Sequence, residues 1–281
     1  LKSAHAVDRE CRVMTALYDT DVPVPKTFGY CDDETVIGTP FFVMDHVVGN
    51  IYWELLLPGC DPNQRREIYL SMNDTIAKLH NVDFDKVNLA DYGKHENYMD
   101  RQIHRWTKQY KDSETQMIPE INELIEWLPK NIPSDQETSI VHGDFRLDNM
   151  IFDPITHEVK AILDWELSTL GNPIADFTYH MMSWRLPAGA KGLGMMGSDL
   201  KSLNIPSESE YAELYYKKTG REKIDNWDFY MAYNIFRLAG IAQGIVGRVR
   251  DGTASSSEAK NYEAFVPILG KLGWSIVEGI K

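Results

Sequence analysis

The chain has 281 residues, 43% of them hydrophobic, which is enough to bury a large core in one two-lobed domain or two small ones. Its formal net charge of −13 argues against nucleic acid and against an anionic membrane surface as partners. No apolar run approaches the length of a transmembrane helix. The three cysteines are odd in number and lack metal-binding spacing, so we expect reduced thiols and a cytoplasmic location.

The first predicted element is a helix with an apolar stripe through Val7, Cys11 and Met14. Glu10 falls on the same stripe. A carboxylate that faces a core is costly unless a cation meets it. Glu10 is therefore either the partner of a buried cation or an ordinary half-exposed residue paired with a nearby arginine.

An extended connector, Asp21 to Pro25, leads to predicted strands at 28–31 and 41–47. The second strand ends in Met44, Asp45, His46 and Val47. Its composition alone fits any core strand, since no side chain there is specific to a nucleotide.

Three helices are expected next, over 61–80, 96–111 and 118–128. The second carries a basic face made of Arg101, His104, Arg105, Lys108 and Lys111. The simpler interpretation is a solvated surface. The sharper one is that Arg101 or Arg105 reaches an anionic acceptor substrate, either a carboxylate or the phosphates of coenzyme A.

The stretch 140–166 is the most informative in the chain. Apolar residues lead into the turn His142-Gly143-Asp144, and Asn149 opens a second apolar run. A third strand, over 159–163, ends at Asp164. We expect Asp144, Asn149 and Asp164 to gather at the strand ends of one small hairpin. Their carboxylate and amide oxygens suit Mg²⁺.

This stretch resembles a known family. The spacing H-x-D-x-x-x-x-N from His142 to Asn149, followed by Asp164, is similar to the catalytic loop and metal-binding aspartate of kinases. Gly143, the sequence Asp-Trp-Glu at 164–166 and Gly-Asn-Pro-Ile-Ala-Asp-Phe at 171–177 resemble the aminoglycoside phosphotransferase and choline kinase-like family. Within it, they look most like small-molecule kinase domains related to those fused to acyl-CoA dehydrogenases.

The resemblance covers most of the chain from about Asp8 and implies an α+β, protein-kinase-like two-lobed fold. The small lobe, residues 1–48, would be N-terminally incomplete. The large lobe, residues 49–281, would be mainly helical with a catalytic β-hairpin. Further helices are expected after Asp176, over 208–219 and 226–248, and at the C-terminus.

The resemblance also implies phosphoryl transfer from ATP, with Mg²⁺, to the hydroxyl of a small molecule. Asp144 would accept or orient the proton of that hydroxyl. Other residues would support it: Asn149 and Asp164 would hold Mg²⁺, Arg146 would contact the transferring phosphoryl group, His142 would support the loop from behind, and Asp176 would accept hydrogen bonds from it.

On the nucleotide side, Glu10 occupies the position of the glutamate that pairs with the ATP-binding lysine. The Gly-rich loop and that lysine are therefore expected before residue 1, unless they are lost. Met44 would guard the back of the adenine pocket, and backbone groups around Asp45, His46 and Val47 would bind adenine.

The glycines at 192, 194 and 197 spell G-x-G-x-x-G, but a dinucleotide site requires a preceding strand, which is missing here. We expect a mobile substrate-side loop instead, with Arg185 as a substrate contact. The expected acceptor is a hydroxy acid or a hydroxyacyl-CoA, and the expected partner, fused or associated, is an acyl-CoA dehydrogenase.

Three alternatives stay open. The chain could be an aminoglycoside- or choline-type kinase with another acceptor, or a pseudokinase-like nucleotide-binding module. It could also be a metal-dependent hydrolase that uses His142, Asp144 and Asp164 without ATP.

Overall fold

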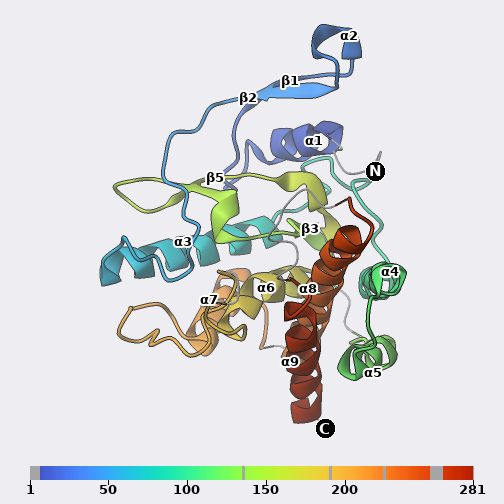
Figure 1. Ribbon diagram of the computed structural model, residues 1–281. Helices are drawn as coiled ribbons and strands as arrows, with labels where there is room; N and C mark the ends of the chain where they lie inside the picture. The colour runs from blue at the N-terminus through green and yellow to red at the C-terminus, as the bar shows by residue number, and fades with distance from the viewer. Residues whose placement is uncertain (1–6, 135–136, 190–191, 224–225, 254–261, 281) are drawn as a thin grey trace. The chain divides into compact units, whose positions relative to one another are not determined.

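A computed structural model describes residues 7–134, 137–189, 192–223, 226–253 and 262–280 (Figure 1). The chain divides into two compact units, residues 1–94 with 138–223, and residues 95–137 with 224–281. The lobe boundary expected near residue 48 stays a prediction. None of the helices in the described ranges is both long and apolar enough to cross a bilayer.

The first unit mixes helices with short strands. Its helices are α1 (Val7–Leu17), α2 (Glu34–Ile37), α3 (Pro62–His80), α6 (Pro173–Met181) and α7 (Glu208–Thr219). Its 3₁₀ turns are η2 (Leu147–Asn149), η3 (Trp165–Leu167) and η4 (Met182–Trp184). Its strands are β1 (Thr27–Cys31), β2 (Phe41–Met44), β3 (Ser139–Val141), β4 (Met150–Phe152), β5 (Val159–Ile162) and β6 (Thr169–Gly171). Every helix expected in this unit is therefore confirmed.

Local sequence explains where α3 and α7 begin. Asp61 accepts the backbone N–H of Gln64, whose side chain accepts the backbone N–H of Asp61 in return. Ser207 and Glu210 form the same reciprocal cap on α7, and Gly220 ends that helix in the left-handed conformation. Such caps satisfy backbone groups that the first and last helical turns leave unpaired. The two helices then pack against each other in the first unit.

The strands form three separate antiparallel pairs, β1–β2, β3–β6 and β4–β5. The prediction that one hairpin carries all three oxygen-bearing residues is therefore wrong, because they lie on two strand pairs. Asp144 follows β3, which pairs with β6, whereas Asn149 and Asp164 flank the β4–β5 hairpin. Strand β6 was not predicted because it is only three residues long and follows a 3₁₀ turn.

Helix α6 is buried along its whole length and carries the polar core of the first unit. His180 on this helix is 5% exposed, and its Nε2 lies 3.0 Å from the hydroxyl of Tyr211. Phe145 and Trp184 pack edge-on against its ring. Burial among these groups lowers the pKa of His180 to about 4, because the imidazolium form would lose its hydration.

The second unit is helical in its described part. It contains α4 (Tyr98–Ser113), α5 (Pro119–Trp127), the 3₁₀ turn η1 (Leu128–Lys130), α8 (Trp227–Arg250) and α9 (Phe265–Ile280). Helix α8 packs against both α4 and α9, and α9 also packs against α5. Glycines allow these close contacts: a Cβ on residue 247 would lie 2.8 Å from Ser113, and one on residue 273 would lie 2.9 Å from Leu124.

The buried neutral state of His180 predicts a specific loss of stability in acid. Its folded pKa lies below its ordinary value, so the unfolded chain binds this proton first as the pH falls. As the pH falls from ~6.5 to about 4, the free energy of unfolding should decrease by on the order of 3 kcal/mol in total. Urea unfolding at pH 7 and pH 4.5 should show a smaller decline for His180→Gln than for the unmodified protein. An equal decline would exclude His180 as the source.

Candidate active site

The carboxylate of Asp144 lies at the start of the loop after β3 and accepts hydrogen bonds on both oxygens. The hydroxyl of Tyr179 donates to Oδ1 at 2.7 Å, and the amide of Asn149 donates to Oδ2 at 3.3 Å. The same amide donates to the Asp144 carbonyl at 2.9 Å. Asp144 is half-buried, so one side of this held carboxylate still reaches solvent.

The turn that carries Asp144 is fixed by Asp176, the first acid of α6. Asp176 accepts the backbone N–H of His142 on one oxygen and that of Gly143 on the other, both at 2.8 Å. Gly143 has a φ of +84°, and a Cβ there would lie 2.7 Å from the carbonyl oxygen of Leu167. Only glycine meets both constraints without strain. The structure thus brings Asp176 to the loop as the resemblance implied.

Asp176 is itself held by a buried chain of polar groups. His80 Nε2 lies 3.2 Å from its carboxylate, and His80 Nδ1 lies 2.7 Å from the hydroxyl of Tyr215. Burial by itself would raise the pKa of Asp176, but its hydrogen bond to His80 and the nearby His142 outweigh burial and lower it. The loop is therefore anchored by an ionised carboxylate in the protein interior.

His142 supports the loop and does not face a metal. Its Nε2–H donates to the carbonyl of Leu163 at 3.0 Å, and its Nδ1 accepts the backbone N–H of Asp144 at 3.2 Å. These partners fix the neutral tautomer, because a carbonyl can only accept and an amide can only donate. The ring also packs 4.8 Å from Trp165. Both ring nitrogens are used, so the structure opposes the hydrolase alternative, which requires His142 as a metal ligand.

Asn149 and Asp164 are brought together by the backbone, since the N–H of Leu163 donates to the Asn149 carbonyl at 2.8 Å. The side-chain amide of Asn149 faces two acceptors on Asp144, so its Oδ1 points elsewhere and has no hydrogen bond in the described ranges. Asp164 is exposed in the left-handed conformation, with a φ of 64°. Its carboxylate likewise has no partner among the described residues. Two hard oxygens without partners in the described chain, on segments joined by this backbone hydrogen bond, suit Mg²⁺.

Arg146 is paired within the loop. Its Nε donates to Asp148 Oδ1 at 3.1 Å, and Nη2 also bonds this carboxylate. Burial by itself would lower the pKa of Arg146. The hydrogen bond to Asp148 and the negative charge of Asp144 outweigh burial and raise the pKa overall, so the guanidinium stays charged. Nη1 makes no hydrogen bond within the described chain, and the side chain is 37% exposed. Its contact with a phosphoryl group stays a prediction.

The residues expected to bind the nucleotide lie in the first unit. Glu10 is half-buried on α1, while Cys11 and Met14 carry most of the buried stripe. Met44 ends β2 and is 39% exposed. The backbone N–H of Asp45 is already bonded to Lys26, but backbone groups of His46 and Val47 make no hydrogen bond among the described residues. They are therefore available to a ligand such as adenine.

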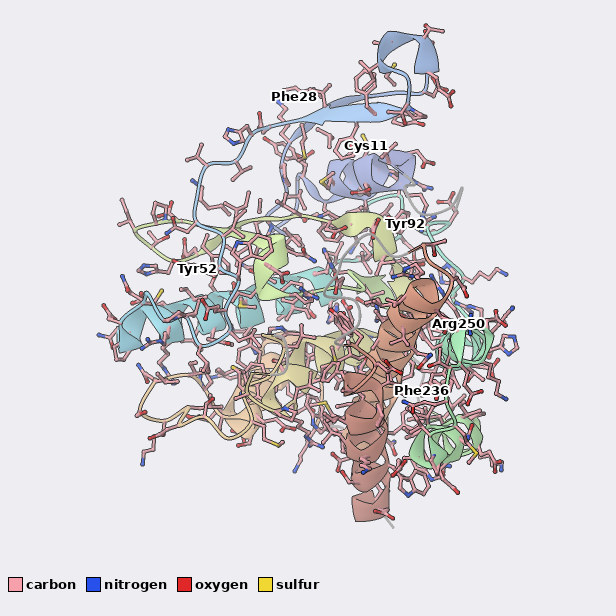
Figure 2. All side chains as sticks on the ribbon, in the orientation of Figure 1. Cys11, Phe28, Tyr52, Tyr92, Phe236 and Arg250 are labelled. Carbon is pink, nitrogen blue, oxygen red and sulfur yellow. The ribbon has the colours of Figure 1, made fainter. Side chains whose placement is uncertain are left out.

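A contact between α1 and the loop after Asp164 was missed from the sequence. The guanidinium of Arg9 stacks 4.2 Å from the ring centre of Tyr92 and donates to the backbone carbonyls of Tyr92 and Ser168. The hydroxyls of Tyr92 and Ser168 lie 2.6 Å apart. Figure 2 shows Tyr92 next to α1. Helix α1, which carries Glu10, is thus hydrogen-bonded through Arg9 to the segment that follows Asp164.

The expected acceptor-side arginines belong to other elements of the chain. Arg185 forms a two-pronged ion pair with Glu208, with contacts of 2.7–3.0 Å. Arg101 and Arg105 lie on α4 in the second unit, where Arg105 is exposed over the ring of Trp106. Their substrate roles stay predictions. Among the described residues between η4 and the loop at 192–197, the β-structure is limited to an isolated bridge that joins Pro187 to Met196 within the loop.

Tyr179 is the functional residue that the sequence concealed. It lies three residues after Asp176 on a fully buried helix, and tyrosine in that setting usually indicates core packing. One turn of helix places it on the same side as Asp176, which already faced the loop. That spacing was the available signal.

Comparison with known proteins shows what the chain is similar to. The model of the phosphotransferase enzyme family matches residues 2–213. Acyl-CoA dehydrogenase family member 10 of Mus musculus is 45% identical over 275 residues, which are 98% of this chain and 26% of that protein. The chain thus spans about a quarter of that relative's length.

Solved structures agree. A crystal structure assigned to the aminoglycoside phosphotransferases, from Ralstonia eutropha, is 49% identical, covers 98% of this chain and 84% of its own, and superposes with a TM-score of 0.94. Aminoglycoside phosphotransferase APH(3'')-Id from Streptomyces rimosus, in complex with ADP and streptomycin, is 16% identical with a TM-score of 0.56 and covers 84% of each chain. That second likeness shows the fold alone. The expected protein-kinase-like fold and the resemblance are confirmed.

The same change from aspartate to asparagine should affect the free energy of unfolding very differently at buried Asp176 and at exposed Asp91. Asp176→Asn removes an acceptor for two backbone N–H groups and leaves His80 without its anion, so we expect a loss of about 3–5 kcal/mol in the free energy of unfolding at pH 7. Asp91→Asn, at an exposed ion pair with Arg12, should cost about 0–1 kcal/mol.

The difference between the two variants should be measured by urea unfolding from pH 7 to pH 3. The lowered pKa of Asp176 means that its contribution is present above the ordinary carboxyl pKa and is lost as the pH falls through the folded value. Similar losses for both variants at pH 7 would contradict the anchor.

Proposed function

Because the chain belongs to the phosphotransferase enzyme family, we propose that it transfers the terminal phosphoryl group of ATP to the hydroxyl of a small molecule, with Mg²⁺. The observation that carries the proposal is the arrangement of three oxygen-bearing side chains. Asp144 is held by Tyr179 and Asn149, while Asn149 Oδ1 and Asp164 offer oxygens without partners in the described chain.

The proposed reaction follows from these roles. The acceptor oxygen forms a bond to the terminal phosphorus, the bond to the bridging oxygen breaks, and ADP leaves. Asp144 orients the hydroxyl and receives its proton, a role that typically contributes ~10²–10⁴-fold to the rate. Mg²⁺ held by Asn149 Oδ1 and Asp164 would offset the negative charge of the phosphates. Arg146, which stays charged, would donate to the transferring group from its unbonded nitrogen.

For the acceptor, we propose a hydroxy acid or a hydroxyacyl-CoA. Two points support this choice: the relative named above is an acyl-CoA dehydrogenase family member, and the basic face of α4 includes Arg101 and Arg105. A cationic acceptor such as an aminoglycoside would instead favour an acidic wall. We also propose that the chain works fused to, or associated with, an acyl-CoA dehydrogenase, in the cytoplasm.

A pseudokinase-like module is the remaining alternative. It predicts that nucleotide raises the thermal unfolding temperature while no hydroxylated metabolite stimulates ATP consumption. Two features favour an active enzyme. Glu10 is half-buried, and Arg9 holds α1 in place by hydrogen bonds, so this helix is in a position to orient a lysine against ATP.

Replacement of the proposed base tests the reaction. Asp144→Ala should reduce phosphoryl transfer at least ~10²-fold in an assay of the terminal phosphate, using hydroxy acids and hydroxyacyl-CoA thioesters as acceptors. Asp91→Asn, remote from the proposed chemistry, should retain activity. Near-normal turnover by Asp144→Ala would overturn the assignment.

The hydroxyl of Tyr179 should matter to turnover more than to folding. Tyr179→Phe leaves the ring in place but removes the donor to Asp144 Oδ1, so we expect kcat to fall about 10-fold while KM changes little. Tyr110→Phe is the matched control, because the Tyr110 hydroxyl is buried without a hydrogen-bond partner in the described chain. If both variants keep the kcat of the unmodified enzyme, Tyr179 does not act on the base.

A further inference from the structure

We propose that the second compact unit contains a separate binding site for a phosphate-bearing metabolite. The site is a groove of about 370 Å³ between α4 and the last turns of α8, where Figure 2 labels Arg250. Its lining residues come from both helices and the residue after α8: Arg105, Lys108, Gln109, Asp112, Ser113, Gly244, Gly247, Arg248, Arg250 and Asp251. Arg105 also supports the acceptor proposed above, so the test measures the binding of a phosphate compound directly and does not use turnover as its readout.

The groove is lined by residues with polar ends and no hydrophobic side chain. All ten residues are polar or glycine, and the aliphatic stems of the arginines and the lysine supply its apolar surface, so the choice of ligand depends on the charged ends. A volume of about 370 Å³ lies at the small end of the range for ligand sites, so a compact molecule or one charged group of a larger molecule would fit.

The charges of the groove identify an anion. Lys108 is paired with Asp112 at 2.6 Å, and Arg250 with Asp251 at 2.8 Å, so both acids of the groove are already neutralised. Arg105 and Arg248 have no carboxylate partner among the described residues. Two such guanidinium groups on a chain of formal charge −13 leave a locally positive surface that a dianion would balance.

Donor groups converge on one glycine of the groove. A Cβ on residue 244 would lie 3.3 Å from Gln109 Nε2 and 3.9 Å from Arg248 Nη1. The glycine therefore leaves open a place that two N–H-bearing groups from different helices approach. Guanidinium groups bind phosphate through two parallel hydrogen bonds, and a phosphate monoester carries a charge of about −1.5 to −2 at pH 7. These properties favour phosphate over a single carboxylate.

Helix electrostatics account for only part of this cluster. Cations in the last turn of a helix offset the partial negative charge of its unpaired carbonyls, which explains Arg248 and Arg250 individually. They do not explain Arg105, which lies in the middle of α4, or the absence of any apolar side chain from the groove.

The test compares three proteins of known charge. The double variant R105E/R248E removes the unpaired cations, and K217E/K271E makes the same change of net charge at exposed lysines outside the groove. Calorimetric titration with inorganic pyrophosphate, in EDTA so that no divalent cation assists binding elsewhere, gives the dissociation constants. Thermal unfolding checks that each variant is folded, and R105Q/R248Q replaces the double reversal if it is not.

We expect pyrophosphate to bind the unmodified protein and K217E/K271E equally, and R105E/R248E about tenfold or more weakly, since two guanidinium groups that could bond the anion are replaced by carboxylates that repel it. Equal affinity in all three proteins would overturn the site. Vesicles of phosphatidylcholine with and without phosphatidylserine separate the two sources of phosphate. Groove-dependent binding to the anionic vesicles without binding of pyrophosphate would replace the metabolite by a membrane surface and so overturn the proposal.

Discussion

The carboxylate of Asp176 is the constraint on which the candidate site depends. It is 3% exposed and accepts two consecutive backbone N–H groups at 2.8 Å, so it fixes the direction in which the chain leaves β3. A buried anion is costly unless hydrogen bonds and a nearby partner compensate for lost hydration, and His80 with Tyr215 behind it supplies that compensation. The turn is thereby defined before any ligand arrives, which is what phosphoryl transfer requires of a protein that mainly positions groups.

A series of short hydrogen bonds links Asp176 to the other residues of the site. The fixed turn directs Asp144 toward Tyr179, which follows Asp176 by three residues on the same helix. Asn149 closes the loop by donating to Asp144, and its carbonyl accepts the N–H of Leu163, next to Asp164. Each contact uses a backbone group or a side chain with two hydrogen-bonding ends. The backbone positions of the proposed base and of the proposed metal ligands are therefore set by the fold.

Sequence reasoning recovered what is encoded locally. Helices with a clear apolar stripe and a cap, such as α3 and α7, were predictable because a few neighbouring residues determine them. The spacing from His142 to Asn149 was predictable because a loop of fixed length joins two strands. The pairing of β3 with β6, the bond from Tyr179 and the stacking of Arg9 on Tyr92 were not, because each joins residues distant in the chain and leaves no local pattern. The sequence alone does not show whether the polar end of a buried tyrosine or arginine contributes to packing or to chemistry.

The central claim is that Asn149 Oδ1 and Asp164 form one cation site beside the held carboxylate of Asp144. Crystals of the protein grown with ADP and Mn²⁺, a substitute for Mg²⁺ that can be located by its anomalous scattering, test it most directly. The account predicts a manganese peak within coordination distance of both Asn149 Oδ1 and the Asp164 carboxylate. Nucleotide bound with its manganese away from both residues, or Asp144 and Asp164 facing different clefts, would contradict it.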